Sequence, residues 1–172
     1  GRTASVGIAV AHHLYPLDAA LNAAHAAERE AKRLEDKGAV CLRVIKRSGE
    51  TFNARSRWAD MGNLFNNLVE MFAADALAGR APYELLAQAP TVGELDEAAQ
   101  RALLRRLVKR HSRLGEAEAS ALAGQLGDWA LAMRRALPPC PPDDGTTGAA
   151  CGLTELARWL IAARFVAQGG AE

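Results

Sequence analysis

The hydrophobic pattern of this chain changes its period once, close to Trp58, and this change limits the folds that the chain can adopt. Before that point, apolar segments at 3–11 and 40–45 have the composition and alternation of β-strands. After it, apolar residues recur every three or four positions, as they do on one face of an α-helix. We therefore predict an α+β protein in which a β-containing part, 1–58, precedes an all-helical part, 59–172.

The first part is predicted to form a strand, a helix and a hairpin. Residues 3–11 are small, β-branched and apolar throughout, which is typical of a strand buried on both faces. The helix that follows is predicted to end at Gly38. Ser48 and Gly49 form the turn signal of a hairpin whose second strand covers 50–57. The apolar stripe of the predicted helix is Leu17, Ala20, Leu21, Ala24, Ala27, Ala31 and Leu34.

The second part is predicted to form a helical bundle. Asp60 is a candidate cap for its first helix, and Thr91 and Glu94 have the spacing of a capping box at the start of another. Residues 138–152 are rich in proline and glycine, so an exposed loop is expected there. The predicted helices cover 61–79, a short stretch from Pro82, 91–115, 116–137 and 153–168.

Composition and short motifs exclude several classes of protein. The formal net charge is only +1, so no global field attracts the chain to nucleic acid or to anionic lipid. The three cysteines form no closely spaced pair, so we expect no metal site and a reduced, cytoplasmic protein. No apolar run approaches the roughly 18 residues that cross a membrane. The sequence also lacks a P-loop and the GxGxxG, HExxH and GxSxG motifs.

Two blocks at the start of the chain have a recognisable form: residues 5–9 (SVGIA) follow the pattern S-x-G-x-A in a predicted strand, and the Ala-Lys pair at 31–32 stands where the following helix ends. These two blocks are similar to the end of a polymerase/cyclase palm of the GGDEF type, which implies a partial ferredoxin-like fold for residues 1–58. Two further blocks, 11–17 (AHHLYPL) and 46–50 (KRSGE), are more specific. Together these blocks resemble the palm of the large subunit of type III CRISPR effector complexes, above all its Cmr (III-B) form.

Two later blocks extend this resemblance along the chain. Residues 80–86 (RAPYELL) and 162–167 (AARFVA) are similar to the helical C-terminal domain of the same subunit. The chain is therefore expected to be a C-terminal fragment of that subunit. The resemblance implies partners, namely other CRISPR effector subunits and, through the complex, guide RNA and target RNA.

The resemblance also implies what the parent subunit does. Its palm binds ATP and a divalent metal and makes cyclic oligoadenylates when target RNA is bound, and its metal ligands lie in a Gly-Gly-Asp-Asp hairpin. That tetrapeptide is absent here, and the single Asp-Asp pair, Asp143 and Asp144, lies in the proline-rich segment. The nuclease domain that often begins the subunit is missing too. Because two-metal chemistry needs clustered carboxylates, we expect this fragment to hold no catalytic residue, metal or cofactor, and to serve structural and docking roles.

Three residues are candidates for nucleotide binding in the parent palm. Lys32 matches the phosphate-contacting lysine of the GGDEF pattern, but it also stands four residues after Glu28, with which it can pair on the helix surface. His12 and His13 follow a predicted strand, where ligands often approach an open sheet. A hydrogen-bonded histidine with no ligand is the alternative there. Lys46 and Arg47 flank the hairpin turn and are expected to be solvated.

Cations also crowd one predicted helix. Arg105, Arg106, Lys109 and Arg110 are candidates for docking another subunit or RNA, because several arginines can act together on a phosphate backbone or an acidic surface. The alternative is an ordinary solvated helix face.

Two other functions stay open at this stage. One is a diguanylate-cyclase-like signalling palm with a helical appendage, and the other is a helical adaptor module whose β-containing part is a small cap. A strand, a helix and a hairpin also leave unpaired strand edges, so self-association is expected through them.

Overall fold

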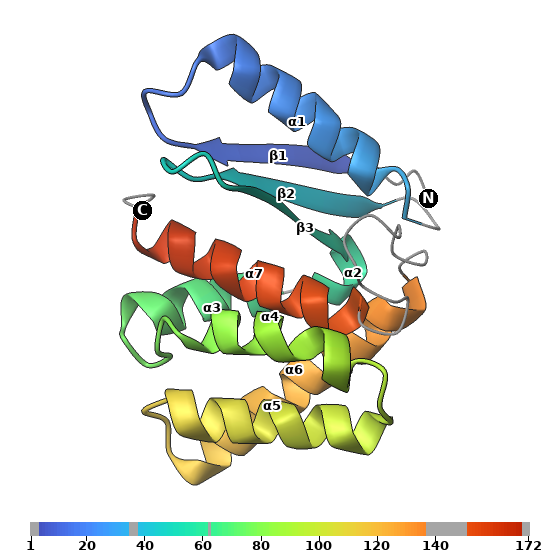
Figure 1. Cartoon of the computed structure of the whole chain (residues 1–172), viewed down its shortest axis with the longest axis vertical. Helices are drawn as coiled ribbons and strands as arrows, with labels where there is room; N and C mark the ends of the chain where they lie inside the picture. Colours follow the sequence, from blue (N-terminus) through green and yellow to red (C-terminus); the bar gives the residue numbers. More distant parts are fainter. Residues whose placement is uncertain (1–3, 35–37, 62, 137–150, 170–172) are drawn as a thin grey trace.

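The computed structural model describes residues 4–34, 38–61, 63–136 and 151–169. Its elements are stacked in layers (Figure 1): α1 covers one face of a β-sheet, α7 lies on the other face, and α3, α4, α5 and α6 continue beyond α7, while the short α2 follows β3 directly. The strands are β1 (Val6–Ala11), β2 (Ala39–Ile45) and β3 (Thr51–Arg57). The helices are α1 (Leu17–Ala31), α2 (Trp58–Met61), α3 (Leu64–Ala73), α4 (Ala81–Val92), α5 (Glu97–His111), α6 (Glu116–Ala136) and α7 (Cys151–Ala167).

The strands described form one mixed sheet in the order β1-β2-β3. β1 runs parallel to β2, with Val6 opposite Val40, and α1 provides the crossover between them. β2 and β3 form the predicted hairpin, with Ala39 opposite Arg57. At its turn, Gly49 adopts a φ of 87°, which explains why glycine follows serine there. The mixed α+β fold, a β-α-β-β unit followed by helices, is thus confirmed.

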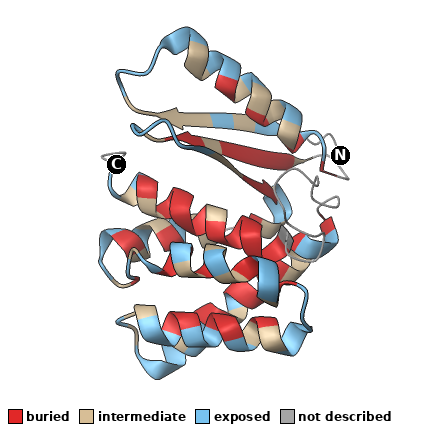
Figure 2. Cartoon of the chain, in the orientation of Figure 1, coloured by how far each residue is buried: buried red, intermediate tan, exposed pale blue. Residues whose placement is uncertain are grey.

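The prediction that 3–11 forms a strand buried on both faces was wrong. β1 lies at the edge of the sheet, and the side chains of Val6 and Ile8 are 37% and 40% exposed. β2 is the buried strand, because it has a neighbour on each side, α1 over one face and α7 near the other (Figure 2). Both strands are rich in apolar residues, so composition does not reveal which one is buried. Their positions in the sheet make β2 more buried than β1.

The apolar stripe predicted for α1 is correct only in its second half. Ala27, Ala31 and the following Leu34 are buried, whereas Leu17 is 74% exposed. Leu21 is exposed as well. The reason is close packing: a Cβ on Gly7 of β1 would lie 2.1 Å from the backbone nitrogen of Glu28. Only small side chains fit into such a short separation between helix and sheet, so alanines fill it and the leucines stand outside.

Two predicted helix starts were wrong. Asp60 does not cap the long helix but lies inside the short α2, where its carboxylate pairs with Arg57. The Thr91–Glu94 capping box does not form either, because α4 continues to Val92. Asp96 caps α5 instead, and its side chain accepts a hydrogen bond of 2.8 Å from the backbone nitrogen of Ala99. Aspartate at an N-cap satisfies one of the donors left free in the first turn.

α7 is the centre of the molecule, in contact with β3, α3, α4 and α6. It is buried along most of its length, as Figure 2 shows. It begins at Cys151, so the end of the expected loop is helical, while 138–150 lie outside the described residues. A Cβ on Gly152 would meet the carbonyl oxygen of Ala130 at 2.2 Å, which shows how closely α7 crosses α6. None of the helices in the described ranges is long and apolar enough to cross a membrane.

Candidate functional site

Three segments that are far apart in the sequence meet at the phenol of Tyr83, in the first turn of α4. The Nζ of Lys46, at the end of β2, donates to its oxygen at 3.2 Å. An Nη1 of Arg164, in the last turn of α7, donates to the same oxygen at 3.3 Å. Both cations also lie against the Tyr83 ring, at 5.4 Å and 5.7 Å from its centroid. The cluster therefore combines hydrogen bonds with cation–π contacts.

Lys46 is not solvated, contrary to the prediction. Its side chain is only 9% exposed, because it lies between Tyr83, the ring of Phe52 and the carboxylate of Glu50, 2.9 Å away. Burial alone would lower the pKa of Lys46, but the hydrogen bonds to Glu50 and Tyr83 raise it above its usual range. The lysine is thus a permanent cation that fastens the hairpin to the helical part. Arg47 is exposed, as expected.

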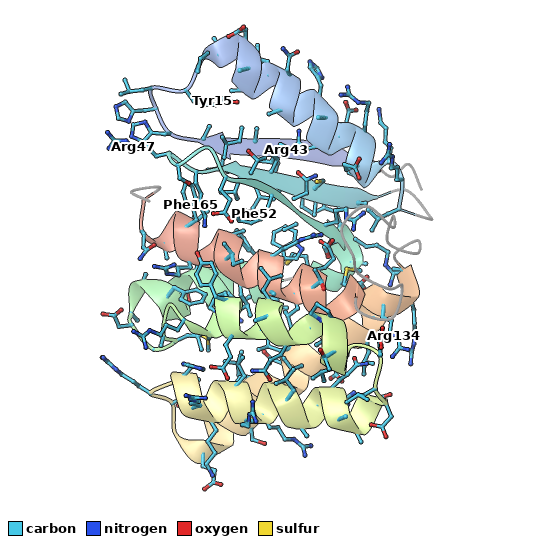
Figure 3. All side chains as sticks on the ribbon, in the orientation of Figure 1. Tyr15, Arg43, Arg47, Phe52, Arg134 and Phe165 are labelled. Carbon is cyan, nitrogen blue, oxygen red and sulfur yellow. The ribbon has the colours of Figure 1, made fainter. Side chains whose placement is uncertain are left out.

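His12 and His13 line a hollow of about 520 Å³ beside this cluster, at the carboxyl end of β1. Phe165 and Val166 of α7 form its opposite wall. Figure 3 shows Phe165 and Phe52 in the layer between α7 and the hairpin, with Arg47 at the outer end of the hairpin.

The two histidine rings stack at a tilt, with centroids 4.2 Å apart. The Nδ1 of His12 accepts a hydrogen bond of 3.3 Å from the backbone nitrogen of Leu14. Partial removal from water, then His13 and Arg47, lower the pKa of His12. The lowered pKa and the hydrogen bond accepted by Nδ1 both favour the neutral ring of His12, with Nε2 as its donor.

The structure does not bring Lys32 together with the histidines. The histidines precede α1 and Lys32 follows it, and a helix of 15 residues is about 22 Å long. Lys32 is 61% exposed and pairs with Glu28 at 2.7 Å. The ion pair with Glu28, which was the alternative for Lys32, is thus present. The three nucleotide-binding candidates therefore lie at two separate positions in the fold, Lys32 at one and the two histidines at the other.

The cations of α5 divide into two groups. Arg106, Arg110 and His111 face α4, where the carboxylate of Glu84 lies 4.0, 3.5 and 2.7 Å from them. The hydrogen bond from His111, followed by the charge of Arg110, lowers the pKa of Glu84. This group therefore fastens α5 to α4.

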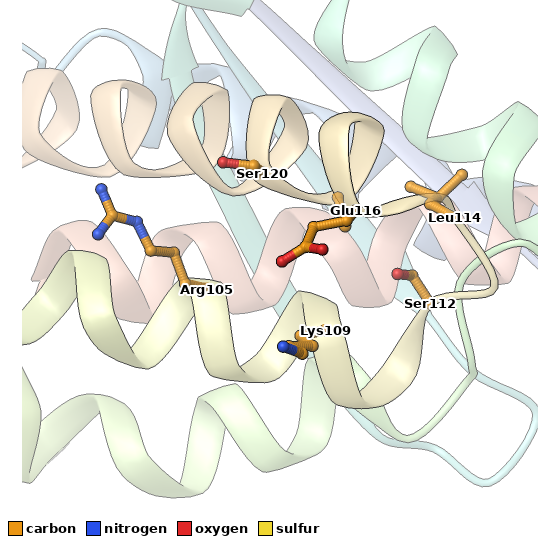
Figure 4. Close-up of a pocket in the computed structure, with 7 residues that line it drawn as sticks. Arg105, Lys109, Ser112, Leu114, Glu116 and Ser120 are labelled. Carbon is orange, nitrogen blue, oxygen red and sulfur yellow. The ribbon is translucent and has the colours of Figure 1, made fainter.

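Arg105 and Lys109 form the second group and face α6. They line a hollow of about 330 Å³ between the two helices (Figure 4). Among the described residues, neither side chain forms a hydrogen bond or an ion pair. The four docking candidates therefore fall into two classes. Arg106 and Arg110 are paired with Glu84, whereas Arg105 and Lys109 are available to a partner.

Sequence reasoning missed a buried ion pair between sheet and helix. Glu155 of α7 is fully buried, and its carboxylate accepts from Nη2 of Arg55 at 2.7 Å and from Arg158 at 2.9 Å. It also accepts from the backbone nitrogen of Arg55 at 2.8 Å, while the indole of Trp159 donates to the Arg55 carbonyl at 2.9 Å. The outer edge of β3 is thus hydrogen-bonded by α7. The sequence signal that could have revealed this ion pair is Glu155 itself, the single acidic residue in the largely apolar stretch 153–163.

The ATP and divalent metal implied for the parent palm need clustered ligands. Within the described ranges, no group of three histidine, cysteine or acidic side chains could hold a metal ion. Asp143 and Asp144 lie outside those residues. The described donor set does not fit a two-metal centre.

No protein-family model matches this sequence, and none of the curated proteins matches it.

Proposed function

We propose that this chain is the C-terminal part of the large subunit of a type III CRISPR RNA-guided effector complex, of the Cmr (III-B) form. Its role there is structural and docking. The parent palm binds ATP and makes cyclic oligoadenylates when target RNA is bound, with carboxylates that precede this part.

One observation supports the proposal: four of the sequence blocks that resemble that subunit, at 11–17, 46–50, 80–86 and 162–167, lie together in space. Lys46 of the KRSGE block and Arg164 of the AARFVA block both bond to Tyr83 of the RAPYELL block. His12 and His13 of the AHHLYPL block share a hollow with Phe165. Residues that fasten a palm to its helical domain would meet as these do.

The division of the α5 cations supports the docking role. Arg106 and Arg110 are engaged within the chain, but Arg105 and Lys109 remain available to a partner. Surface ion pairs contribute only about 0–1 kcal/mol each, so cations kept on an exposed helix contribute little to folding. An ordered RNA or acidic surface uses them far better, because several charges then act together.

The test is to isolate the protein from its own cells. A tag added to the chromosomal gene leaves the natural protein at its full length. We expect short guide RNAs and helical subunit proteins to co-purify with it, and an untagged strain is the control.

Two outcomes would contradict the proposal. Partner proteins without any RNA would indicate a helical adaptor. A purified protein that carries neither RNA nor partners, and that makes cyclic diguanylate from GTP, would indicate a signalling palm.

A further inference from the structure

The hollow between α5 and α6 combines charges of both signs. Arg105 and Lys109 lie on its α5 side, Glu116 and Ser120 on its α6 side, and Ser112 on the connection between the helices (Figure 4). Among the described residues, the carboxylate of Glu116 forms no ion pair, so it does not neutralise the two cations. The remaining wall is Leu114 and Ala119, both half-buried.

We propose that this hollow binds the sugar–phosphate backbone of single-stranded RNA. Arg105 and Lys109 are four residues apart on one helix, which separates them by about 6 Å along its axis. This separation allows each cation to take its own phosphate along a strand. The forked guanidinium of Arg105 bonds two phosphate oxygens, and the ammonium of Lys109 contributes a point charge. The hydroxyls of Ser112 and Ser120 donate to the remaining phosphate oxygens.

Glu116 selects RNA over DNA. An ionised carboxylate only accepts hydrogen bonds, and it repels phosphate, so a purely anionic ligand gains nothing from it. A ribose 2′-hydroxyl donates to such a group, and DNA lacks that hydroxyl. The pair of cations therefore binds the backbone, while the carboxylate recognises the sugar.

The lining of this hollow also indicates that the protein does not recognise the base sequence of the bound RNA. Proteins that hold single-stranded bases stack them on aromatic rings. The side chains that line this hollow include none, so the contact is limited to backbone and sugar.

This inference deepens the proposed function and rests on it for the presence of RNA in the complex. Its test uses the 172-residue chain alone, so it can fail while guide RNA still co-purifies. The ligands are fluorescent oligonucleotides of uridine and of deoxyuridine, equal in length, which differ only in the 2′-hydroxyl. Binding is measured by anisotropy between 50 and 200 mM salt.

We expect the parent to bind the RNA at least threefold more tightly than the DNA. Two phosphates neutralised on a single strand give a salt slope of about −1.4, so binding weakens about sevenfold across the series. The double variant Arg105→Ala/Lys109→Ala loses this slope. Glu116→Gln keeps RNA binding and brings the RNA and DNA affinities within twofold of each other.

The matched control is Arg106→Ala/Arg110→Ala, which removes the same charge from the α4 side of the same helix and keeps the RNA affinity within twofold. Thermal melting followed by circular dichroism shows that each variant is folded. An equal loss of binding in both double variants would overturn the site, because the cations would then act only as total charge. Equal binding of RNA and DNA by the parent would overturn the role of Glu116. No binding of either oligonucleotide at 50 mM salt would overturn the RNA assignment.

Discussion

At the scale of single residues, Glu155 is the charged group whose burial costs the most free energy, because its carboxylate is removed entirely from water. It is tolerated because four donors surround it: two from the Arg55 guanidinium, the backbone nitrogen of Arg55 and the guanidinium of Arg158. Desolvation would otherwise make a buried charge prohibitive. The same carboxylate accepts from the backbone at the outer edge of β3, so it packs α7 against the sheet and also occupies that strand edge.

We predict that Glu155→Ala lowers the free energy of unfolding by about 3–5 kcal/mol, since it leaves Arg55 buried without its partner. Glu155→Gln should cost less, because its amide oxygen still accepts from the Arg55 backbone. Urea denaturation followed by circular dichroism measures both. Glu30→Ala is the control: Glu30 lies 3.9 Å from Arg55 at a partly exposed position, so its loss should cost no more than about 1 kcal/mol. An equal decrease in the free energy of unfolding for Glu155→Ala and Glu30→Ala would show that the buried ion pair stabilises the fold no more than the partly exposed one.

Cys41 provides a second prediction, which concerns pH. Burial in β2 raises the pKa of its thiol from 9.0 to about 12. The folded state therefore favours the neutral thiol, and this stability is complete below pH 9 and is lost as the pH rises towards 12. In a Cys140→Ser/Cys151→Ser background, Cys41 should resist a thiol reagent at pH 8 until urea unfolds the chain. The free energy of unfolding should then fall by about 2 kcal/mol between pH 9 and 11.

The control for this pH dependence is Cys41→Ala, which lacks the thiol and should lose that part of the slope. Rapid labelling of Cys41 in the folded chain at pH 8 would contradict the prediction.

At the scale of elements, the packing of α1 on β1 depends on a missing side chain. The glycine of the SVGIA block lies directly beneath the helix, with the Ala24 carbonyl 2.4 Å and the Glu28 nitrogen 2.1 Å from where a Cβ would be. Both atoms belong to the backbone, so the helix as a whole must move if a methyl group is added. This contact gives the strand block a physical reason for its glycine.

We predict that Gly7→Ala lowers the free energy of unfolding by about 3 kcal/mol, the upper end of the range for overpacked cores. Gly124→Ala in α6 is the matched control. A Cβ there meets nothing within 4 Å, so the change should stabilise the helix by about 0.5–1 kcal/mol. Thermal and urea unfolding of the two variants measure the contrast. A neutral Gly7→Ala would mean that α1 packs more loosely than this structure has it.

At the scale of the whole molecule, the two edges of the sheet have different surroundings. The β3 edge is engaged by Glu155 and Trp159 at Arg55, whereas the outer edge of β1 has no neighbouring strand among the described residues. Val6 and Ile8 are exposed along it. An apolar strand with a free edge is a template for pairing with another chain. The self-association expected from the sequence is thereby narrowed to β1.

We predict that the isolated chain forms dimers as its concentration rises and that Ile8→Lys keeps it monomeric, because a charge on an edge strand opposes pairing. Sedimentation analysis measures the mass. Leu21→Lys is the control, since it adds the same charge to an exposed apolar position on α1 and should leave the dimer intact. A parent that stays monomeric at every concentration, or a Leu21→Lys variant that also loses the dimer, would refute edge pairing by β1.

The sequence by itself determined the order of elements. Periodicity and turn chemistry act over a few residues, so the strand, helix and hairpin were predictable, as was α6 from Glu116. Local patterns failed where two candidates competed. Thr91 and Asp96 are both good caps, and the end of α4 decided between them.

Only the tertiary structure decided which parts are buried and which charges are free. Glu155 and Arg55 are 100 positions apart, so no local pattern pairs them. Arg105 and Arg106 are adjacent and alike in sequence, yet one faces the hollow at α6 and the other faces Glu84 of α4. Consecutive positions on a helix point about 100° apart, so the neighbours that surround the helix give them different roles. The candidate site belongs to this second class, because Lys46, Tyr83 and Arg164 meet only when the sheet and the helices have packed.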